Sequence, residues 1–93
     1  MAREIVLEDQ IVAYAEACGW LVRKMIYPGR RGCPDRWFFK HGAIVIMEIK
    51  RAGRPAQPDG NQVREHRRLR DHGFRVHLVN DFETARALLD AAA

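Results

Sequence analysis

Three side chains in the middle of the sequence have types and a spacing that could do chemistry. The stretch from residue 32 to residue 50 reads GCPDRWFFKHGAIVIMEIK, with Asp35 near its start and Glu48 and Lys50 near its end. Side chains two residues apart in a strand point to the same face, so Glu48 and Lys50 should project together. If the stretch folds back on itself as a hairpin, two carboxylates and one amine meet at the same end.

The register of this hairpin follows from where its turn lies. Apolar and aromatic residues on either side of residues 40–42 predict two strands that are joined there. Pairing the strands symmetrically about His41 places Asp35 opposite Met47, and therefore within a residue or two of Glu48.

A divalent cation would explain why the two carboxylates are kept together. Like charges repel, and buried carboxylates lose their hydration. Mg²⁺ or Mn²⁺ relieves both problems, because such hard ions bind one or two carboxylates together with water and phosphate oxygens. Lys50 could then stabilise charge that develops on a phosphate. The alternative is that Asp35 caps a turn while Glu48 and Lys50 form a surface ion pair. The apolar strand before Glu48 favours the metal site, because a solvated edge strand would alternate with polar residues.

Composition predicts a single globular domain over residues 1–93, with 47% hydrophobic and 30% charged residues. No apolar run approaches the ~18 residues of a membrane span. The first ten residues carry acids where a secretory signal would be apolar. We therefore expect a cytoplasmic protein, in a bacterium or a virus-infected host cell, with no membrane partner. Cys18, Cys33 and the four histidines have no spacing typical of zinc or disulfide sites.

Positive charge is concentrated in the middle of the chain. Residues 23–75 contain 14 of the 16 lysines and arginines but only five of the 12 acids, and two of those five are Asp35 and Glu48. A basic surface around a small acidic pocket suits a polyanion such as nucleic acid, although it could also be an ordinary solvated surface. The candidate DNA-binding residues are Arg30, Arg31, Arg51, Arg54, Arg64, Arg67 and Arg68.

Periodicity and cap residues predict the elements that must position these groups. They are a helix over residues 4–18, a strand over 20–27, the two hairpin strands, a helix from Asp59 to about His72, a strand over 74–80, and a final helix capped by Asp81. The order α-β-β-β-α-β-α is that of an α/β protein. The strand with Glu48, the following helix and the strand at 74–80 should form a right-handed crossover between parallel strands.

Glu8, in the first predicted helix, has two interpretations. It lies one turn before Ile11 and Val12, on or beside the inward stripe. The helix dipole favours an acid in the first turn, and position alone favours this explanation. The alternative is that Glu8 is a third carboxylate of the site.

The helix after Asp59 carries two further residues of interest. Asp59 and Gln62 have the spacing of a capping box, so Gln62 could complete the cap or point into the pocket. Val63, His66 and Leu69 form one line at helical spacing, which we predict to face inward. A histidine on such a line is more often a packed residue than a metal ligand.

Aromatic residues cluster in and before the hairpin. No strand has the pattern of a stacking platform for single-stranded nucleic acid. Trp20, Trp37, Phe38 and Phe39 are therefore expected in the core or in a dimer interface.

Together these motifs resemble the virus-type replication-repair nuclease (VRR-NUC) domain, a branch of the PD-(D/E)xK nuclease superfamily. The matching features are an early acid at Glu8, GRRGCPD at residues 29–35, EIK at 48–50, Gln62 at the start of a helix, and LRDHGFRV at 69–76. The match covers nearly the whole chain.

The resemblance implies a restriction-endonuclease-like core with a mixed central sheet flanked by helices. It implies that Asp35 and Glu48 bind a metal ion, with the Ile49 carbonyl as a third ligand. Glu8 would reach the metal, directly or through water. Lys50 would orient or activate the attacking water, and Gln62 would position Lys50 or the nucleophile.

The resemblance also implies a reaction and partners. These are hydrolysis of DNA phosphodiester bonds with Mg²⁺ or Mn²⁺, a 5′-phosphate product, a homodimer, and branched DNA such as Holliday junctions. The alternatives are a non-catalytic DNA-binding module and a nuclease subunit that needs a partner protein. The complete set of site residues argues against a decayed site.

Overall fold

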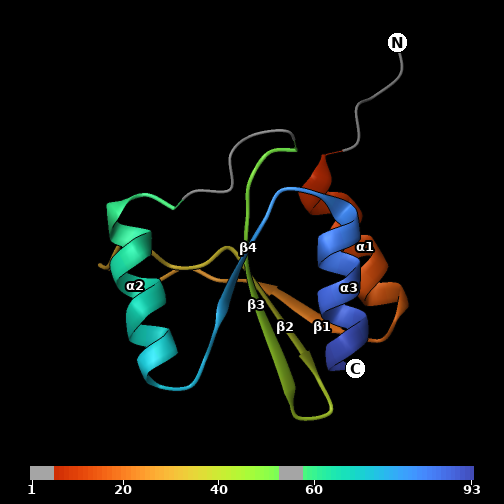
Figure 1. Ribbon diagram of the computed structural model, residues 1–93. Coiled ribbons are helices and arrows are strands. Elements are labelled where there is room, and N and C mark those ends of the chain that lie inside the picture. The colour runs from red at the N-terminus through yellow and green to blue at the C-terminus, as the bar shows by residue number, and fades with distance from the viewer. Residues whose placement is uncertain (1–5, 53–57) are drawn as a thin grey trace.

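The computed structural model describes residues 6–52 and 58–93, and it confirms the predicted order of elements (Figure 1). The elements are α1 (Leu7–Ala17), β1 (Leu21–Lys24), β2 (Arg36–Lys40), β3 (Ala43–Ile49), α2 (Gly60–Asp71), β4 (Val76–Val79) and α3 (Phe82–Ala92). Asp59 and Asp81 cap α2 and α3, as the sequence predicts.

Three elements are shorter than predicted. Val6 is extended and precedes α1, so the helix begins at Leu7; residues 4 and 5 lie outside the described part of the chain. β1 ends at Lys24. β4 begins at Val76, because Phe74 lies in the turn that follows α2, where its N–H donates to the carbonyl of Leu69 at 2.8 Å.

The four strands form one mixed sheet in the order β1-β2-β3-β4. β1, β2 and β3 pair antiparallel, whereas β3 and β4 pair parallel. The parallel pairing confirms the predicted step from the Glu48 strand through a helix to the next strand. It also brings the ends of β3 and β4 to the same edge of the sheet.

The predicted hairpin register is wrong by one residue. The turn has two residues, His41 and Gly42, with φ of 46° and 86°. Two-residue turns with positive φ at both positions match the twist of paired strands. Lys40 therefore pairs with Ala43, and Arg36 rather than Asp35 comes opposite Met47. Extending this ladder by one step brings Asp35 opposite Glu48.

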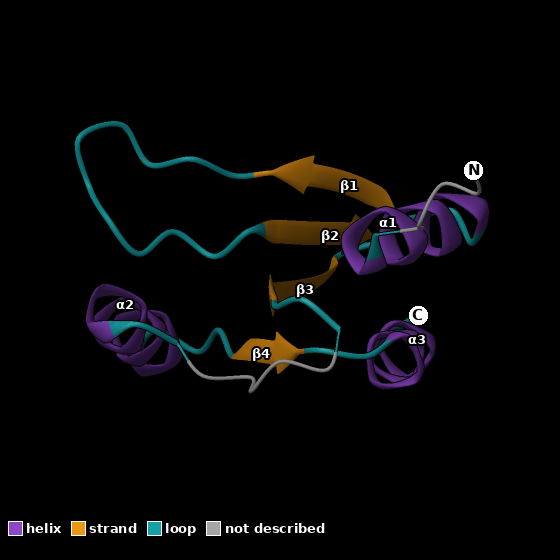
Figure 2. Ribbon diagram, turned by 90° about the horizontal axis from the view of Figure 1, so that it is seen from above, coloured by secondary structure: helices purple, strands orange, loops and turns teal. Residues whose placement is uncertain are grey.

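The hydrophobic core lies between the sheet and the pair α1 and α3. Figure 2 shows these two helices on one side of the sheet and α2 on the other. The core contains Leu7, Ile11, Ala15, Trp20, Val22, Phe38, Val45, Met47, Val79, Ala85 and Leu89. Within the described residues, no helix is long and apolar enough to span a membrane.

The predicted inward line of α2 is only partly right. Val63 is 42% exposed, and the one buried residue of the helix is Glu65. His66 and Leu69 are half-buried. α2 is therefore attached largely through polar contacts, and these contacts are made at the candidate site.

Candidate active site

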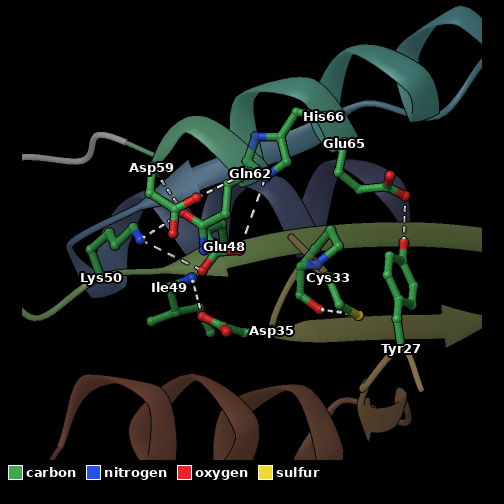
Figure 3. A network of polar contacts seen from close by, with 11 residues as sticks. Tyr27, Cys33, Asp35, Glu48, Ile49, Lys50, Asp59, Gln62, Glu65 and His66 are labelled. Atoms are coloured by element: carbon green, nitrogen blue, oxygen red, sulfur yellow. Dashed lines mark hydrogen bonds and ion pairs between the residues drawn. The ribbon is translucent and has the colours of Figure 1, made fainter. Parts of the chain in front are cut away.

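The end of the β2–β3 hairpin holds the two predicted carboxylates. Ile49 packs against the core, so its neighbour Glu48 points to the opposite face of the sheet, toward α2 (Figure 3). Asp35 immediately precedes β2, and its Oδ2 accepts a hydrogen bond from the Ile49 N–H at 3.2 Å. This contact fixes the Asp35 carboxylate beside Glu48.

Glu48 is the most deeply buried charged residue of the described chain, with only 2% of its surface exposed. Its Oε2 lies 3.7 Å from Nζ of Lys50. Its Oε1 is buried without a hydrogen-bond partner among the described residues. Burial, and then the neighbouring Asp35 carboxyl, raise the pKa of Glu48 to about 8, while Lys50 and Gln62 act in the opposite direction. A positive charge placed near Glu48 would therefore stabilise the ionised form of its carboxyl group.

Gln62 connects α2 to the site. Its Oε1 accepts hydrogen bonds from Nζ of Lys50 at 3.0 Å and from the Asp59 N–H at 3.1 Å. The Asp59 carboxylate accepts in return from the Gln62 N–H at 2.9 Å, which completes the capping box. The predicted capping box is therefore present, and the same oxygen atom also contacts the Lys50 amine.

Glu8 lies next to the site, but its carboxylate is already paired. It lines a cavity of about 480 Å³ together with Ile49, Lys50 and Arg51. Its Oε2 accepts from Nε of Arg36 at 2.6 Å. Sequence reasoning missed Arg36, and its place directly after Asp35 was the one signal that could have identified it.

The loop between β1 and β2 is attached to α2 by contacts that the sequence did not reveal. The hydroxyl of Tyr27 donates to Oε2 of the buried Glu65 at 2.9 Å. Gly32 has φ of +92°, and a Cβ there would lie 2.6 Å from the carbonyl oxygen of Asn61. Only glycine combines this conformation with such a close approach. The only sequence signal was an isolated acid, Glu65, in a basic helix.

His66 lies one turn after Gln62 and also reaches the site. Its Nε2 is buried, lies 4.0 Å from Oε1 of Glu48, and has no hydrogen-bond partner among the described residues. Burial, and then Lys50, lower the pKa of His66, which favours the neutral imidazole. The sequence favoured a packed histidine, and the position beside Glu48 became visible only in three dimensions.

The predicted DNA-binding arginines that the structure describes lie in three segments around the site. The exposed ones are Arg30 and Arg31 in the β1–β2 loop, Arg51 after β3, and Arg64, Arg67 and Arg68 on α2. Arg54 lies outside the described residues. Because the loop is attached to α2 through Glu65 and Asn61, its two arginines lie on the same part of the molecule as the helix.

The donor atoms present fit a hard divalent cation. In residues 6–52 and 58–93, no three His, Cys, Asp or Glu side chains converge to hold a metal ion by themselves. What the site offers is oxygen, from Asp35, Glu48 and the backbone at Ile49. Mg²⁺ is commonly held by one or two carboxylates, with water and substrate phosphate completing its shell. The buried Oε1 of Glu48 marks an acceptor that a cation or a donor would satisfy.

Comparison with known proteins is consistent with this geometry. No protein-family model matches the chain. The chain is 35% identical over 92 residues to a protein named "Putative nuclease p44" from Acyrthosiphon pisum secondary endosymbiont phage 1, covering 98% of this chain and 96% of that relative. A solved structure described as a "VRR_NUC domain" is similar with a TM-score of 0.77 and 35% identity, over 96% of this chain and 100% of the other.

The chain belongs to the VRR-NUC nuclease family. The resemblance that the motifs indicated is thereby confirmed, and so is the α/β fold with a mixed sheet between helices. In this VRR-NUC chain, Asp35, Glu48, Lys50 and Gln62 lie together at one end of the sheet.

Proposed function

We propose that this VRR-NUC protein is a metal-dependent endonuclease that hydrolyses phosphodiester bonds in DNA. The observation that carries the proposal is the buried Glu48, which lies beside Asp35 and 3.7 Å from the Lys50 amine. A buried carboxylate beside a second, half-buried carboxylate is costly unless a cation joins them. The exposed arginines around it would attract a polyanion.

Each site residue has a role in this proposal. Asp35, Glu48 and the Ile49 carbonyl would hold Mg²⁺ or Mn²⁺, which when bound neutralises the scissile phosphate and lowers the pKa of water. Lys50, held at 3.0 Å by Gln62, would orient the attacking water and stabilise charge on the phosphate. Glu8 borders the same cavity and would assist through water, with Arg36 keeping its carboxylate in place.

The arginines would position DNA rather than read its sequence. Contacts to phosphates fix the orientation of a duplex and carry no base information. Arg30 and Arg31 on the loop and the arginines of α2 are exposed on a part of the molecule that leads to the site. Such a surface suits selection of DNA by shape, as in a branched DNA or a Holliday junction.

We also propose that the protein acts as a homodimer. Leu21, Phe39 and Ile44 are cross-strand neighbours on the sheet face that points away from the core. Leu21 and Ile44 are 50% and 42% exposed. A second copy of the chain would cover this apolar face, and a symmetric dimer supplies the two sites that paired cuts require. The dimer surface is therefore defined as Leu21, Phe39 and Ile44.

Cleavage of defined DNA substrates tests the proposed activity. A four-way junction, a linear duplex and a single strand are incubated in Mg²⁺, in Mn²⁺ and in EDTA. Lys50→Ala and Asp35→Asn are compared with Lys24→Ala and Asp71→Asn, which change exposed residues outside the site. We expect paired cuts in the junction with either metal, and their loss in EDTA and in both site variants.

Other outcomes would contradict the proposal in different ways. Binding without cleavage, weakening steeply with salt, would leave a DNA-binding module. Cleavage that appears only with a second protein would identify a subunit. Cleavage that survives in EDTA or in Lys50→Ala would show that the chemistry does not use this site.

A further inference from the structure

Two buried polar atoms from different elements face each other across the site. Oε1 of Glu48, on β3, and Nε2 of His66, on α2, are 4.0 Å apart. Both are buried without a hydrogen-bond partner among the described residues. Leaving a buried polar atom unpaired is unfavourable, because the atom has lost its hydration and gained no partner. Two such atoms that face each other are therefore candidates for a hydrogen bond with one another.

His66 lies on α2 close to Gln62, which already contacts the candidate site. Residues four apart lie on the same face of a helix, so Gln62 and His66 are neighbours. Gln62 contacts Lys50, and His66 faces Glu48. One face of α2 therefore meets both charged side chains of the Glu-Ile-Lys segment.

We propose that His66 is a positioning residue of the metal site, an inference that rests on the proposed metal-dependent function. Its Nε2–H donates to Oε1 of Glu48 after a small approach of the two side chains from their 4.0 Å separation. This contact holds the Glu48 carboxylate so that Oε2, on the Lys50 side, is presented to the metal ion.

The arrangement fits a positioning residue better than a metal ligand. In Figure 3, Glu48 lies between His66 and Asp35. A metal ion bound by Nε2 of His66 and Oε1 of Glu48 would lie away from Asp35 and lose that ligand. Carboxylates that bind metals are commonly held by a further hydrogen bond, and removing it weakens metal binding about 10–100-fold.

Metal binding without DNA tests this role through three substitutions. His66→Gln keeps an N–H at nearly the reach of Nε2, His66→Asn keeps one that is too short, and His66→Phe keeps a ring without a donor. Isothermal titration of Mn²⁺ should show binding about tenfold or more weaker for the Asn and Phe variants. The Gln variant should remain close to the unmodified protein. His72→Gln, exposed at the end of the same helix, is the matched control and should bind normally.

The imidazole itself provides a second readout that does not depend on any variant folding. In ¹⁵N-labelled protein without DNA, the ring nitrogens of His66 are observed while Mg²⁺ is added. We expect hydrogen on Nε2 and a change in its shift as the metal binds. A signal that does not respond to Mg²⁺ would overturn the proposal. So would hydrogen on Nδ1 with the metal on Nε2, since His66 would then be a ligand.

The outcomes separate this inference from the proposed function. If the unmodified protein binds neither Mn²⁺ nor Mg²⁺, the metal-dependent function fails and the role of His66 fails with it. If the protein binds metal and the Phe and Asn variants bind it equally well, only the role of His66 is overturned. Thermal melting of each variant identifies any that do not fold, and the imidazole signals then decide the question.

Discussion

Gln62 shows how one atom can join helix capping to the chemistry of a site. Its Oε1 accepts from the Lys50 amine and from the Asp59 N–H, at 3.0 and 3.1 Å. A carbonyl oxygen has two lone pairs, so both bonds form at once. The start of α2 and the orientation of Lys50 are therefore set by the same side chain.

Substitutions of Gln62 and Asp59 should separate the role of Gln62 in capping α2 from its role in orienting Lys50. Gln62→Ala removes the acceptor of Lys50 and half of the capping box, whereas Asp59→Ala removes only the side-chain cap. Each should lower the free energy of unfolding by about 1 kcal/mol, as measured by urea denaturation. Gln62→Ala should also slow DNA cleavage about 10–100-fold, as expected for the loss of a positioning contact. Equal cleavage rates in the two variants would contradict a role for Gln62 beyond the cap.

Glu48 should make the stability of the metal-free protein depend on pH. Its usual pKa of 4.5 rises to about 8 in the folded state, chiefly through burial. Between these values the folded protein holds a proton that the unfolded chain has lost, so stability falls as pH rises. The lowered pKa values of His66 and His77 act in the opposite sense, but below about pH 6.5.

The window from pH 6.5 to 8 isolates this effect. In urea unfolding with EDTA, the free energy of unfolding should fall by up to about 2 kcal/mol from pH 6.5 to pH 8, because each pH unit corresponds to about 1.4 kcal/mol. Glu48→Gln, which stays neutral, should lose little stability over the same range. Saturating Mg²⁺ should oppose the loss, because the ion binds the carboxylate form. Identical pH dependence in both proteins would show that Glu48 ionises normally.

At the scale of elements, α2 and the β1–β2 loop hold each other in place. The apolar core lies on the other side of the sheet, and the buried residue of α2 is an acid. The helix is attached by the Tyr27–Glu65 hydrogen bond, the close approach of Gly32 to Asn61, and the contact from Gln62 to Lys50. The loop ends at Asp35, so the same contacts fix one carboxylate of the site.

Two glycines of this loop provide a matched test. Both have positive φ, but a Cβ at Gly32 would lie 2.6 Å from the Asn61 carbonyl oxygen, whereas a Cβ at Gly29 meets nothing within 4 Å. Gly29→Ala should cost only the backbone strain of about 1–2 kcal/mol. Gly32→Ala should cost more, about 3 kcal/mol or above, and should reduce cleavage where the protein still folds. Equal urea midpoints for the two variants would show that the loop does not rest on α2.

At the scale of the whole molecule, the two sheet faces differ in how they are covered. α1 and α3 cover one face, whereas α2 covers only part of the other (Figure 2). Leu21 and Ile44 stay exposed on that second face, and they belong to the proposed dimer surface. A chain of 93 residues has a small core, so burying this surface against a second copy would also add stability.

Sedimentation velocity should therefore find a dimer that depends on this surface. Ile44→Lys places a charge in the proposed dimer surface and should shift the protein to the monomer. Val63→Lys is the control, because Val63 on α2 is also 42% exposed but lies outside the proposed dimer surface. A monomer in the unmodified protein, or a dimer that tolerates Ile44→Lys, would contradict the proposed homodimer.

The sequence was sufficient for the features that follow from local rules. Alternation in a strand places Glu48 and Lys50 on one face, cap spacing identifies Asp59 and Gln62, and apolar periodicity gives the order of the elements. These rules depend on bond geometry and on neighbours a few residues apart, so one chain is enough to apply them.

Tertiary structure decided the contacts between residues far apart in the chain. The exact hairpin register depended on the backbone angles of His41 and Gly42, which moved Arg36 opposite Met47. The inward face of α2 proved polar, because it packs on the site rather than on the core. The pairs Glu8–Arg36, Tyr27–Glu65 and Glu48–His66 join different elements. No periodicity encodes such pairs, because they depend on how the elements are stacked in space.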